Sequence, residues 1–209
     1  MSKVRYAVLV NYNFEPANWW RDYDIQALLY DRSDDGIQRK FDANVKRTAN
    51  VGNVDYDKLC YLIDYYDSLP EVFLWSKTNI FKSVYRDDLE KALEKGEFTP
   101  LLKMNHKTYS DRLGVVCFYS GEIYWERNDS WYVNQMDSRF PTYDAFAQYM
   151  NLPSPAYLPF PPGGNFILTR ERVHRYGRDF YEKMRDALPY AKLCAEAHMC
   201  ERTYYSLWK

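Results

Sequence analysis

Several signatures of other protein classes are missing from this sequence of 209 residues. No window approaches the roughly 18 consecutive apolar residues of a membrane-spanning helix, so we expect no membrane span. The first residues, Met-Ser-Lys-Val-Arg-Tyr, lack the long apolar stretch of a signal peptide. There is no C-x-x-C pair and no zinc spacing, which indicates buried free thiols in a reducing compartment at Cys60, Cys117, Cys194 and Cys200. We therefore expect a cytoplasmic protein.

An excess of either charge is also missing, since 28 Lys and Arg residues stand against 29 Asp and Glu residues and the net charge is −1. General nucleic-acid binders carry an excess of Lys and Arg, which displaces the counterions of the phosphate backbone. A nucleic-acid partner is therefore not expected. The local candidate for a basic patch is Arg39-Lys40 together with Lys46-Arg47.

Three catalytic signatures are absent as well. The sequence contains no G-x-x-x-x-G-K-[ST] phosphate loop, no G-x-S-x-G nucleophile elbow and no H-E-x-x-H zinc helix. Aromatic residues, in contrast, are abundant, with 21 Tyr, 11 Phe and 6 Trp making 18% of the chain. Tyr and Trp combine an apolar ring face with a hydrogen-bonding tip, which suits sugars and nucleobases, although most of these rings are expected to build the core.

The pattern of apolar residues predicts an α/β fold. Residues 3–11 form a near-continuous apolar run that is typical of a central strand buried on both faces. Apolar residues at helical spacing, Leu59, Leu62 and Ile63, predict a helix over 54–66. Further predicted elements are a short helix over 16–23, strands over 24–30, 70–75 and 165–169, a surface helix over 87–95, and helices over 170–188 and 191–208.

Two remaining segments complete the predicted architecture. Ser120-Gly121 lies between apolar runs over 113–119 and 122–126, which predicts an antiparallel hairpin. Residues 152–164 hold five of the ten prolines and predict a rigid loop. We find no internal repeat, so we predict one domain over 1–209, with a mostly parallel, Rossmann-like central sheet flanked by helices and an antiparallel hairpin.

Polar residues follow the first two predicted strands. In open α/β sheets, ligands bind at the carboxyl ends of strands and at helix N-termini. Asn11 and Tyr12 follow the first strand, and Asp31, Arg32 and Ser33 follow the second. A carboxylate there accepts hydrogen bonds from a base or ribose while the Tyr ring stacks on the base. The alternative is a pair of well-capped turns, since Asp and Ser hydrogen-bond their own backbone in turns.

The next two polar segments suggest a site for a phosphate group. Arg47, Asn50 and Gly52 precede the helix at 54–66, and Gly lets the backbone approach a phosphate that the helix amides favour. The alternative is an ordinary capped helix. Ser76-Lys77-Thr78-Asn79 ends the third strand, where Lys77 can neutralise a diphosphate and Thr78 and Asn79 can hydrogen-bond its oxygens; the alternative is a polar strand end in solvent.

Two segments of the second half are candidates for the acceptor side and the chemistry. Gly163-Gly164-Asn165 opens the last strand, where paired glycines leave room for a sugar or acceptor, or simply form a turn after the Pro-rich loop.

Glu196, His198, Glu201 and Arg202 lie within two turns of the last helix. His198 and Arg202 share a face, whereas Glu196 and His198 diverge, so a two-ligand metal site is poorly supported. Our candidates for a catalytic carboxylate are Glu196 first and Glu201 second, with His198 orienting it. The alternative is a helix face held by salt bridges.

Four blocks of sequence, kept in order, support a family resemblance. The first is Asn50-Val-Gly52, then Tyr56-Asp57-x-Leu-x-Tyr61-Leu-Ile-Asp64-x-Tyr66-Asp67-x-Leu69-Pro70 and a Phe-Leu strand. The second is Pro162-Gly-Gly-Asn165-Phe-Ile-Leu-x-Arg170-Glu171, the third is Phe180-Tyr181-Glu182, and the fourth joins Glu196-Ala-His198-x-x-Glu201-Arg202 to Leu207-Trp208. Over most of its length the chain resembles small GT-A-like glycosyltransferases of bacteria and large DNA viruses, including capsid-protein glycosyltransferases of chlorella viruses.

The resemblance implies a nucleotide-sugar donor, most often a UDP-sugar. It would place the base near Asn11-Tyr12 and Asp31-Arg32-Ser33, and the diphosphate near Lys77 to Asn79. Residues of about 1–80 would bind the donor, and about 110–209 would form the acceptor side. Such enzymes usually hold Mn²⁺ or Mg²⁺ with Asp-x-Asp at the strand end where this chain has Ser-Lys-Thr-Asn. Asp31 or the pair Asp34-Asp35 could replace it, or Lys77 could take over the charge, so a weak or substituted metal requirement is expected.

The resemblance thus implies a hexosyltransferase-type glycosyltransferase that acts on a glycan or glycoprotein, a viral capsid protein among the candidates, and that works in the host cytoplasm if the chain is viral. The main alternative is a non-catalytic carbohydrate-binding or interaction protein on the same fold, which the Tyr and Trp content and the missing Asp-x-Asp favour. A third alternative, a nucleotide-dependent transferase acting on nucleic acid, predicts salt-sensitive DNA binding, and the near-zero net charge speaks against it.

Overall fold

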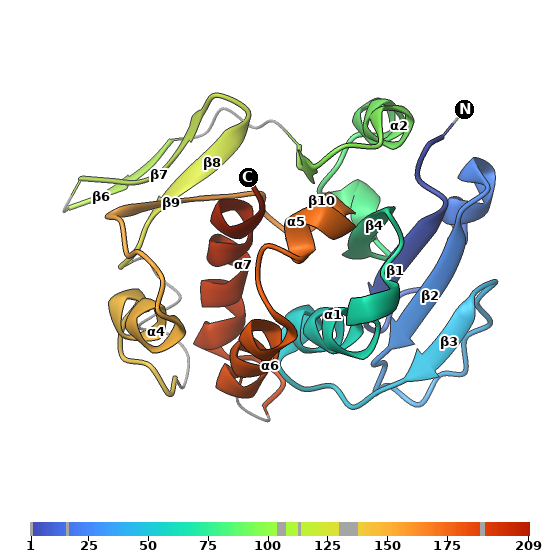
Figure 1. Ribbon diagram of the computed structural model, residues 1–209, viewed down its shortest axis with the longest axis horizontal. Helices are drawn as coiled ribbons and strands as arrows, with labels where there is room; N and C mark the ends of the chain where they lie inside the picture. The colour runs from blue at the N-terminus through green and yellow to red at the C-terminus, as the bar shows by residue number, and fades with distance from the viewer. Residues whose placement is uncertain (1, 16, 104–107, 113, 130–137, 189–190) are drawn as a thin grey trace.

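The computed structural model of the protein describes residues 2–15, 17–103, 108–112, 114–129, 138–188 and 191–209. Its main sheet has six strands in the order β3-β2-β1-β4-β10-β5 (Figure 1). The strands are β1 (Tyr6–Asn11), β2 (Gln26–Asp31), β3 (Asn44–Arg47), β4 (Val72–Lys77), β5 (Thr99–Leu101) and β10 (Asn165–Thr169). The first four in this order are parallel, and β10 runs antiparallel to both β4 and β5.

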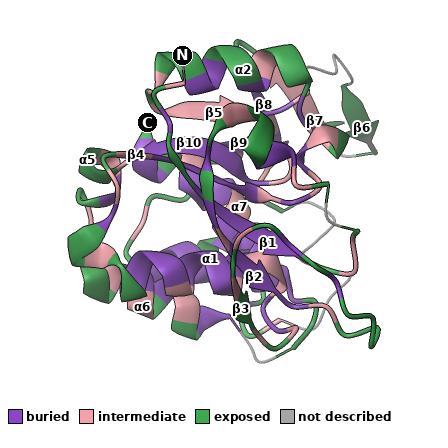
Figure 2. Cartoon of the chain, turned by 90° about the vertical axis from the view of Figure 1, so that its right-hand side faces the viewer, coloured by how far each residue is buried: buried purple, intermediate pink, exposed green. Residues whose placement is uncertain are grey.

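Both faces of the main sheet are covered. Alternate residues of β1 point to opposite faces, so Val8 packs with one core and Leu9 with the other. The first core is closed by α1 (Asn53–Asp64), α6 (Arg178–Ala187) and α7 (Ala195–Trp208). The second is closed by α2 (Arg86–Lys95) and the short helices Trp19–Tyr23 and Ile80–Lys82. Figure 2 shows buried residues running through β1 and along α1.

A second, antiparallel sheet lies on the far side of α7 (Figure 1). Its strands, in order, are β6 (Tyr109–Asp111), β7 (Gly114–Ser120), β8 (Ile123–Arg127) and β9 (Tyr157–Phe160), and β9 contacts α7. Two further helices are α4 (Tyr143–Met150), which packs on α6 and α7, and α5 (Arg170–Val173). The helix α7 therefore separates the two sheets and contributes to the packing of both.

The predicted α/β class and mostly parallel central sheet are confirmed, as are the predicted strands that correspond to β1, β2, β4 and β10. The helices predicted over 54–66 and 87–95 are α1 and α2, and the one predicted over 191–208 is α7. The segment predicted as a short helix over 16–23 is a 3₁₀ helix, Trp19–Tyr23. Pro16 and Leu113, which begin two predicted elements, lie outside the described residues.

The predicted antiparallel hairpin is confirmed as β7 and β8, and it belongs to the separate antiparallel sheet. Two other predictions about the second half were wrong. The Pro-rich segment contains β9, which tolerates Pro159 because β9 is an edge strand of that sheet. The helix predicted over 170–188 is two helices, α5 and α6, because the chain turns out of helical geometry before Gly177, the N-cap of α6. The elements β3, β5, β6 and α4 were not predicted.

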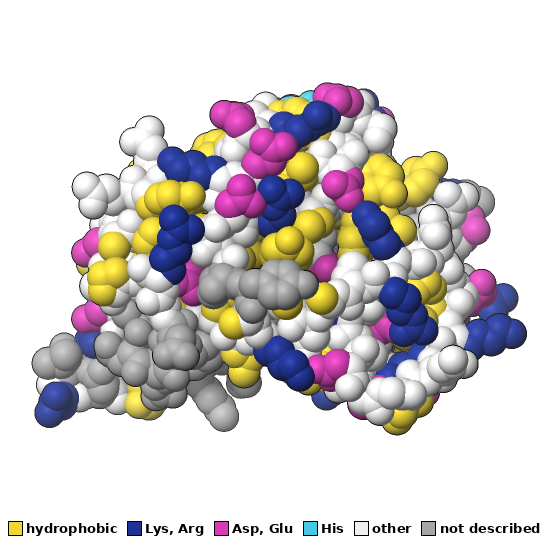
Figure 3. All heavy atoms as spheres, turned by 90° about the horizontal axis from the view of Figure 1, so that it is seen from below, with side chains coloured by type: hydrophobic (Ala, Val, Ile, Leu, Met, Phe, Trp, Pro, Cys, Tyr) yellow, Lys and Arg dark blue, Asp and Glu magenta, His cyan; other side chains and the backbone are white. Residues whose placement is uncertain are grey.

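Surface and thiol properties complete the description. In the described part of the chain, no helix is long and apolar enough to cross a membrane. All four cysteines are free, Cys194 and Cys200 being buried, whereas Cys60 and Cys117 are only partly buried. On the face shown in Figure 3, Lys and Arg side chains are scattered among Asp and Glu. In the candidate basic patch, Arg39, Lys46 and Arg47 are paired with carboxylates.

Candidate functional site

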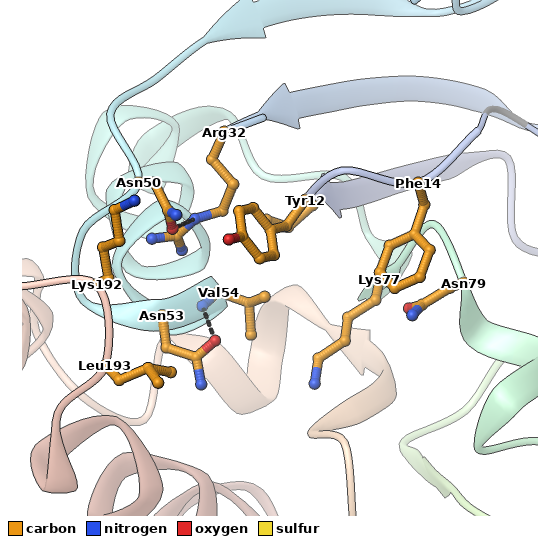
Figure 4. Close-up of a pocket in the computed structure, with 11 residues that line it drawn as sticks. Tyr12, Phe14, Arg32, Asn50, Asn53, Val54, Lys77, Asn79, Lys192 and Leu193 are labelled. Atoms are coloured by element: carbon orange, nitrogen blue, oxygen red, sulfur yellow. Dashed lines mark hydrogen bonds between the residues drawn. The ribbon is translucent and has the colours of Figure 1, made fainter. Parts of the chain in front are cut away.

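A cavity of about 280 Å³ opens at the carboxyl ends of β1, β2 and β4. Figure 4 shows side chains from these strand ends on one side, the start of α1 below, and the segment before α7 on the other side. The lining residues are Val10, Tyr12, Phe14, Arg32, Asn50, Asn53, Val54, Lys77, Asn79, Lys192 and Leu193. Five of the eleven residues predicted to bind the donor line this cavity: Tyr12, Arg32, Asn50, Lys77 and Asn79.

A second group of predicted donor-site residues forms a buried brace beneath the cavity. Asn11 Nδ2 donates to Asp31 Oδ1 at 3.1 Å, and Thr78 Oγ1 donates to Asn11 Oδ1 at 2.6 Å. Ser33 Oγ donates to Asp31 Oδ1 at 2.6 Å, and Arg47 is hydrogen-bonded to Asp31 Oδ2. Asn11, Asp31 and Thr78 are buried, so these residues fix the ends of β1, β2 and β4 relative to one another.

We expect Asp31→Asn to destabilise the fold by about 2 kcal/mol, because it removes a buried carboxylate that pairs with the exposed Arg47 and accepts several hydrogen bonds. Asp24→Asn is the matched control, since Asp24 also pairs with an Arg, Arg5, but its side chain is 93% exposed. The control should change stability by less than about 0.5 kcal/mol. Urea unfolding of the two variants measures the difference, and equal values would show that Asp31 is not a brace.

Arg32 lines the cavity but is itself buried and held by the loop that follows β3. Its Nε donates to Asn50 Oδ1 at 3.1 Å, and its Nη1 lies 3.5 Å from Asp57 Oδ2. Burial lowers the pKa of Arg32, and burial raises the pKa of Asp57 to about 6 although Arg32 opposes that rise. The guanidinium therefore anchors the loop against α1, and the Asn50 amide at the cavity wall is held on its other side by Asp34, whose Oδ2 accepts from Asn50 Nδ2 at 3.0 Å.

The start of α1 offers less to an anion than the sequence suggested. Gly52 is the N-cap with a positive φ of 59°, and its N–H donates to Ala191 O at 2.6 Å. Asn53 N donates to Lys192 O at 3.3 Å, and Val54 N to the side chain of Asn53 at 2.8 Å. Because these amides already have acceptors, the cations that line the cavity are the better groups for a phosphate.

Lys77 is a cation that lines the cavity and whose charge is available to a ligand. Its backbone N–H is tied to Asn165 Oδ1 at 3.3 Å, whereas its ammonium makes no hydrogen bond or ion pair with any described residue. Lys192, in contrast, is paired with Asp34 at 2.5 Å. Figure 4 shows the Lys77 side chain extending into the cavity, near the rings of Tyr12 and Phe14. A half-buried cation without an internal partner is suited to an anionic ligand.

The residues of the cavity do not fit a divalent metal. The described part of the chain holds no group of three His, Cys, Asp or Glu side chains arranged for a metal ion. Asp31 is paired with Arg47, Asp34 with Lys192 and Asp35 with Arg39. Asp55-Tyr56-Asp57 has the sequence Asp-x-Asp, but on α1 the two carboxylates diverge, Asp57 toward Arg32 and Asp55 toward Lys58.

A second polar cluster adjoins the cavity and joins the start of β10 to α7. Gly163 N donates to Glu201 Oε1 at 2.6 Å, and Arg202 Nη1 donates to Glu201 Oε2 at 2.8 Å. His198 Nδ1 lies 3.8 Å from the same Oε2. Burial alone would raise the pKa of Glu201, but His198 and the charges of Arg202 and Lys77 lower it to about 2. Glu201 is therefore a carboxylate that stays ionised near neutral pH.

Glu196 lies elsewhere. It is fully buried, and its Oε1 accepts hydrogen bonds from Ser138 Oγ at 2.9 Å, from Phe140 N at 3.3 Å and from Arg139 N. Glu196 thus holds the segment before α4 against α7. Neither Glu196 nor Glu201 is among the residues that line the cavity, and the catalytic role of Glu196 stays a prediction.

Backbone conformation requires glycine at both positions of the pair, and close packing also requires it at Gly163, where a Cβ would lie 3.0 Å from Asn165 Nδ2. Gly163 and Gly164 have φ angles of 95° and 59°, which side chains rarely adopt. A Cβ on Gly164 would already contact Glu201 Cγ at 3.5 Å, so the pair leaves little room for an acceptor there. Asn165 Oδ1 accepts from Ser76 Oγ at 2.9 Å and from Lys77 N, which connects this turn to β4.

The structure also adds residues that sequence reasoning missed. Phe14, Lys192 and Leu193 line the cavity, and Lys192-Leu193 comes from a loop more than a hundred residues from the strand ends, so no local pattern could indicate it. Lys58 is completely buried within the second cluster. Helical spacing could have indicated Lys58, because it lies four residues before the buried Leu62 and therefore on the same face of α1.

Comparisons with known proteins leave the family open. No protein-family model matches the chain, and no solved structure matches it. The homoserine O-acetyltransferase of Methanomethylophilus alvi (strain Mx1201) is 38% identical over 57 residues. That stretch is 27% of this chain and 17% of the acetyltransferase, so the chain spans less than a fifth of that relative's length.

Proposed function

We propose that this protein is a glycosyltransferase that binds a nucleotide-sugar donor, with a UDP-sugar as the first candidate. The observation that carries the proposal is the Lys77 ammonium, which has no ion-pair partner among the described residues and lies in a cavity at the carboxyl edge of a parallel sheet, beside Tyr12 and Phe14. An aromatic ring and a cation are the groups that a nucleobase and a diphosphate require. The order β3-β2-β1-β4, with an antiparallel β10, supports the finer proposal of a GT-A-like sheet.

The chemistry proposed is transfer of the sugar from the diphosphate to an acceptor hydroxyl. The bond between the anomeric carbon and the diphosphate oxygen breaks, a bond to the acceptor oxygen forms, and the acceptor proton leaves to a base. Lys77 would stabilise the negative charge that develops on the leaving diphosphate. Lys77 would do so without a metal ion, since Asp31, Asp34 and Asp35 are each paired with a cation.

Glu201 is the carboxylate best situated for the sugar. It adjoins the cavity through Lys77, which acts on its pKa, and its ionised state suits the positive charge that develops at the anomeric carbon. The acceptor, a glycan or a glycoprotein such as a viral capsid protein, would approach from the side of the second sheet. There Phe118 stacks on Trp125 with ring centroids 6.5 Å apart, and Tyr157 packs against Phe118 at 5.4 Å.

Calorimetric titration with UDP, UDP-glucose and GDP tests the proposed donor site. We expect saturable binding of UDP and weaker binding of GDP, and the dissociation constant for UDP should change less than about threefold when EDTA replaces manganese. Absence of binding by all three nucleotides would overturn the proposed function. Binding that requires manganese would keep the donor site but replace Lys77 as the main counter-charge.

The alternative is a carbohydrate-binding protein without catalysis, which the abundance of Tyr and Trp favours. Slow hydrolysis of the donor separates the two functions, because a transferase releases UDP from its UDP-sugar even with water as acceptor. A purely binding protein releases none. The measurement is UDP release from a panel of UDP-sugars over hours.

A further inference from the structure

Lys58 is a fully buried lysine whose side chain reaches the turn beside the proposed donor site. The residue is 0% exposed, and its Nζ donates to Gly164 O at 2.6 Å. The neighbouring Gly163 N donates to Glu201 Oε1 at 2.6 Å. Lys58 on α1 and Glu201 on α7 therefore hold the two glycines of one turn from opposite sides.

The charges around Lys58 come from each element that packs against it. Asp55 lies on α1 itself, Lys77 on β4 and Glu201 on α7, and the ring of Trp75 lies 5.0 Å from Nζ. Burial lowers the pKa of Lys58 to about 7, Asp55 and Glu201 oppose this shift, and Lys77 adds to it. Burial raises the pKa of Asp55, and the groups around Asp55 include Lys58, His198 and Tyr204. Near neutral pH, Lys58 is thus poised between ammonium and neutral amine.

A continuous set of contacts connects Lys58 to the cavity. Lys58 binds Gly164 O, and the next residue, Asn165, accepts hydrogen bonds from Ser76 Oγ and from Lys77 N. An anion beside Lys77 would offset the positive charge that disfavours the ammonium form of Lys58. It would also place its own negative charge near Lys58 in a poorly solvated region, where such interactions are strong.

We propose that binding of a nucleoside diphosphate at Lys77 is coupled to the uptake of a proton by Lys58, which strengthens its hold on the Gly163–Gly164 turn. This inference rests on the proposed function of the cavity. The proton comes from buffer and goes to the neutral amine of Lys58, and no covalent bond of the ligand changes. A charged donor makes the stronger hydrogen bond to Gly164 O, so the turn and Glu201 are held more firmly when the donor is bound.

Calorimetry of UDP binding at pH 7.5 to 8, in buffers of different ionisation enthalpy, tests this coupling. A tenfold rise in the proton affinity of Lys58 gives an uptake of about half a proton per UDP bound. The UDP phosphate cannot account for this proton uptake. Its terminal phosphate, with a second pKa of about 6, is already ionised at this pH, and a cationic site disfavours its protonation. By linkage, UDP affinity should fall by up to about tenfold as the pH rises from about 6.5 to 9.

Three variants identify the titrating group. Lys58→Met and Lys58→Arg should both bind UDP without proton uptake, since Met does not titrate and Arg stays charged. His198→Gln is the control, because His198 lies beside Glu201 in the same cluster, and this variant should keep the uptake. Uptake that survives in Lys58→Met, or that vanishes in His198→Gln, overturns the inference.

If the Lys58 variants fail to fold, calorimetry of UDP binding by the wild-type protein alone still tests the proposed coupling. Wild-type binding of UDP with no proton exchanged overturns this inference and leaves the proposed function standing. No binding of UDP by the wild-type protein overturns the proposed function itself, and the coupling with it.

Discussion

Glu201→Gln should lower the rate of UDP release from a UDP-sugar by at least about 100-fold while leaving UDP affinity within about twofold. The substitution keeps the size of the side chain and an acceptor for Gly163 N, but it removes a carboxylate whose pKa is held at about 2. A carboxylate of such low basicity accepts protons poorly, so we expect Glu201 to stabilise the positive charge of the sugar rather than to act as a general base.

Glu196→Gln is the matched control for Glu201→Gln, because both glutamates lie on α7 and both accept hydrogen bonds from backbone amides. Loss of the Glu196 carboxylate should weaken the attachment of the segment 138–140 and lower stability, with the rate per folded molecule reduced less than about fivefold. The measurements are UDP release by both variants and their unfolding in urea. Glu196→Gln that folds normally and loses the rate, beside an active Glu201→Gln, would restore Glu196 as the catalytic carboxylate.

The spacing of apolar residues in the sequence was sufficient to predict most strands of the main sheet. The apolar run of β1 reflects burial on both faces of the sheet, and the helical spacing of Leu59, Leu62 and Ile63 reflects burial of one face of α1. The edge strands β3 and β9 show no comparable pattern of apolar residues in the sequence. All residues of β3 are at least partly exposed, and β9 contains Pro159, which argues for a loop wherever the position of the strand in its sheet is unknown.

The candidate site was predictable only where it follows strands directly. Tyr12, Lys77 and Asn79 come immediately after β1 or at the end of β4, and the sheet rule placed them at one edge. Whether a polar side chain faces the cavity or braces the strands is not encoded locally. Asp31 and Arg32 are adjacent in sequence, yet Asp31 is bonded to Arg47 and Asn11, whereas Arg32 lies at the cavity wall.

Lys77→Ala should weaken UDP binding by about 30- to 100-fold, or about 2 to 3 kcal/mol, without lowering stability. The loss is large because the Lys77 ammonium is the cavity-facing cation that has no carboxylate partner among the described residues, whereas Lys192 is tied to Asp34. Its removal also abolishes a charge–charge interaction that salt screens. UDP affinity of the wild-type protein should therefore fall with added salt more steeply than that of Lys77→Ala.

Lys91→Ala provides the control for Lys77→Ala, since Lys91 is exposed on α2. The helix α2 lies at the opposite end of β1 from the cavity, where Lys3 N donates to Leu93 O at 3.0 Å. Both variants remove one positive charge, so a general effect of net charge on an anionic ligand would weaken both equally. Only a diphosphate held at Lys77 predicts a loss confined to Lys77→Ala, with partial recovery in Lys77→Arg, which keeps the charge but not the geometry.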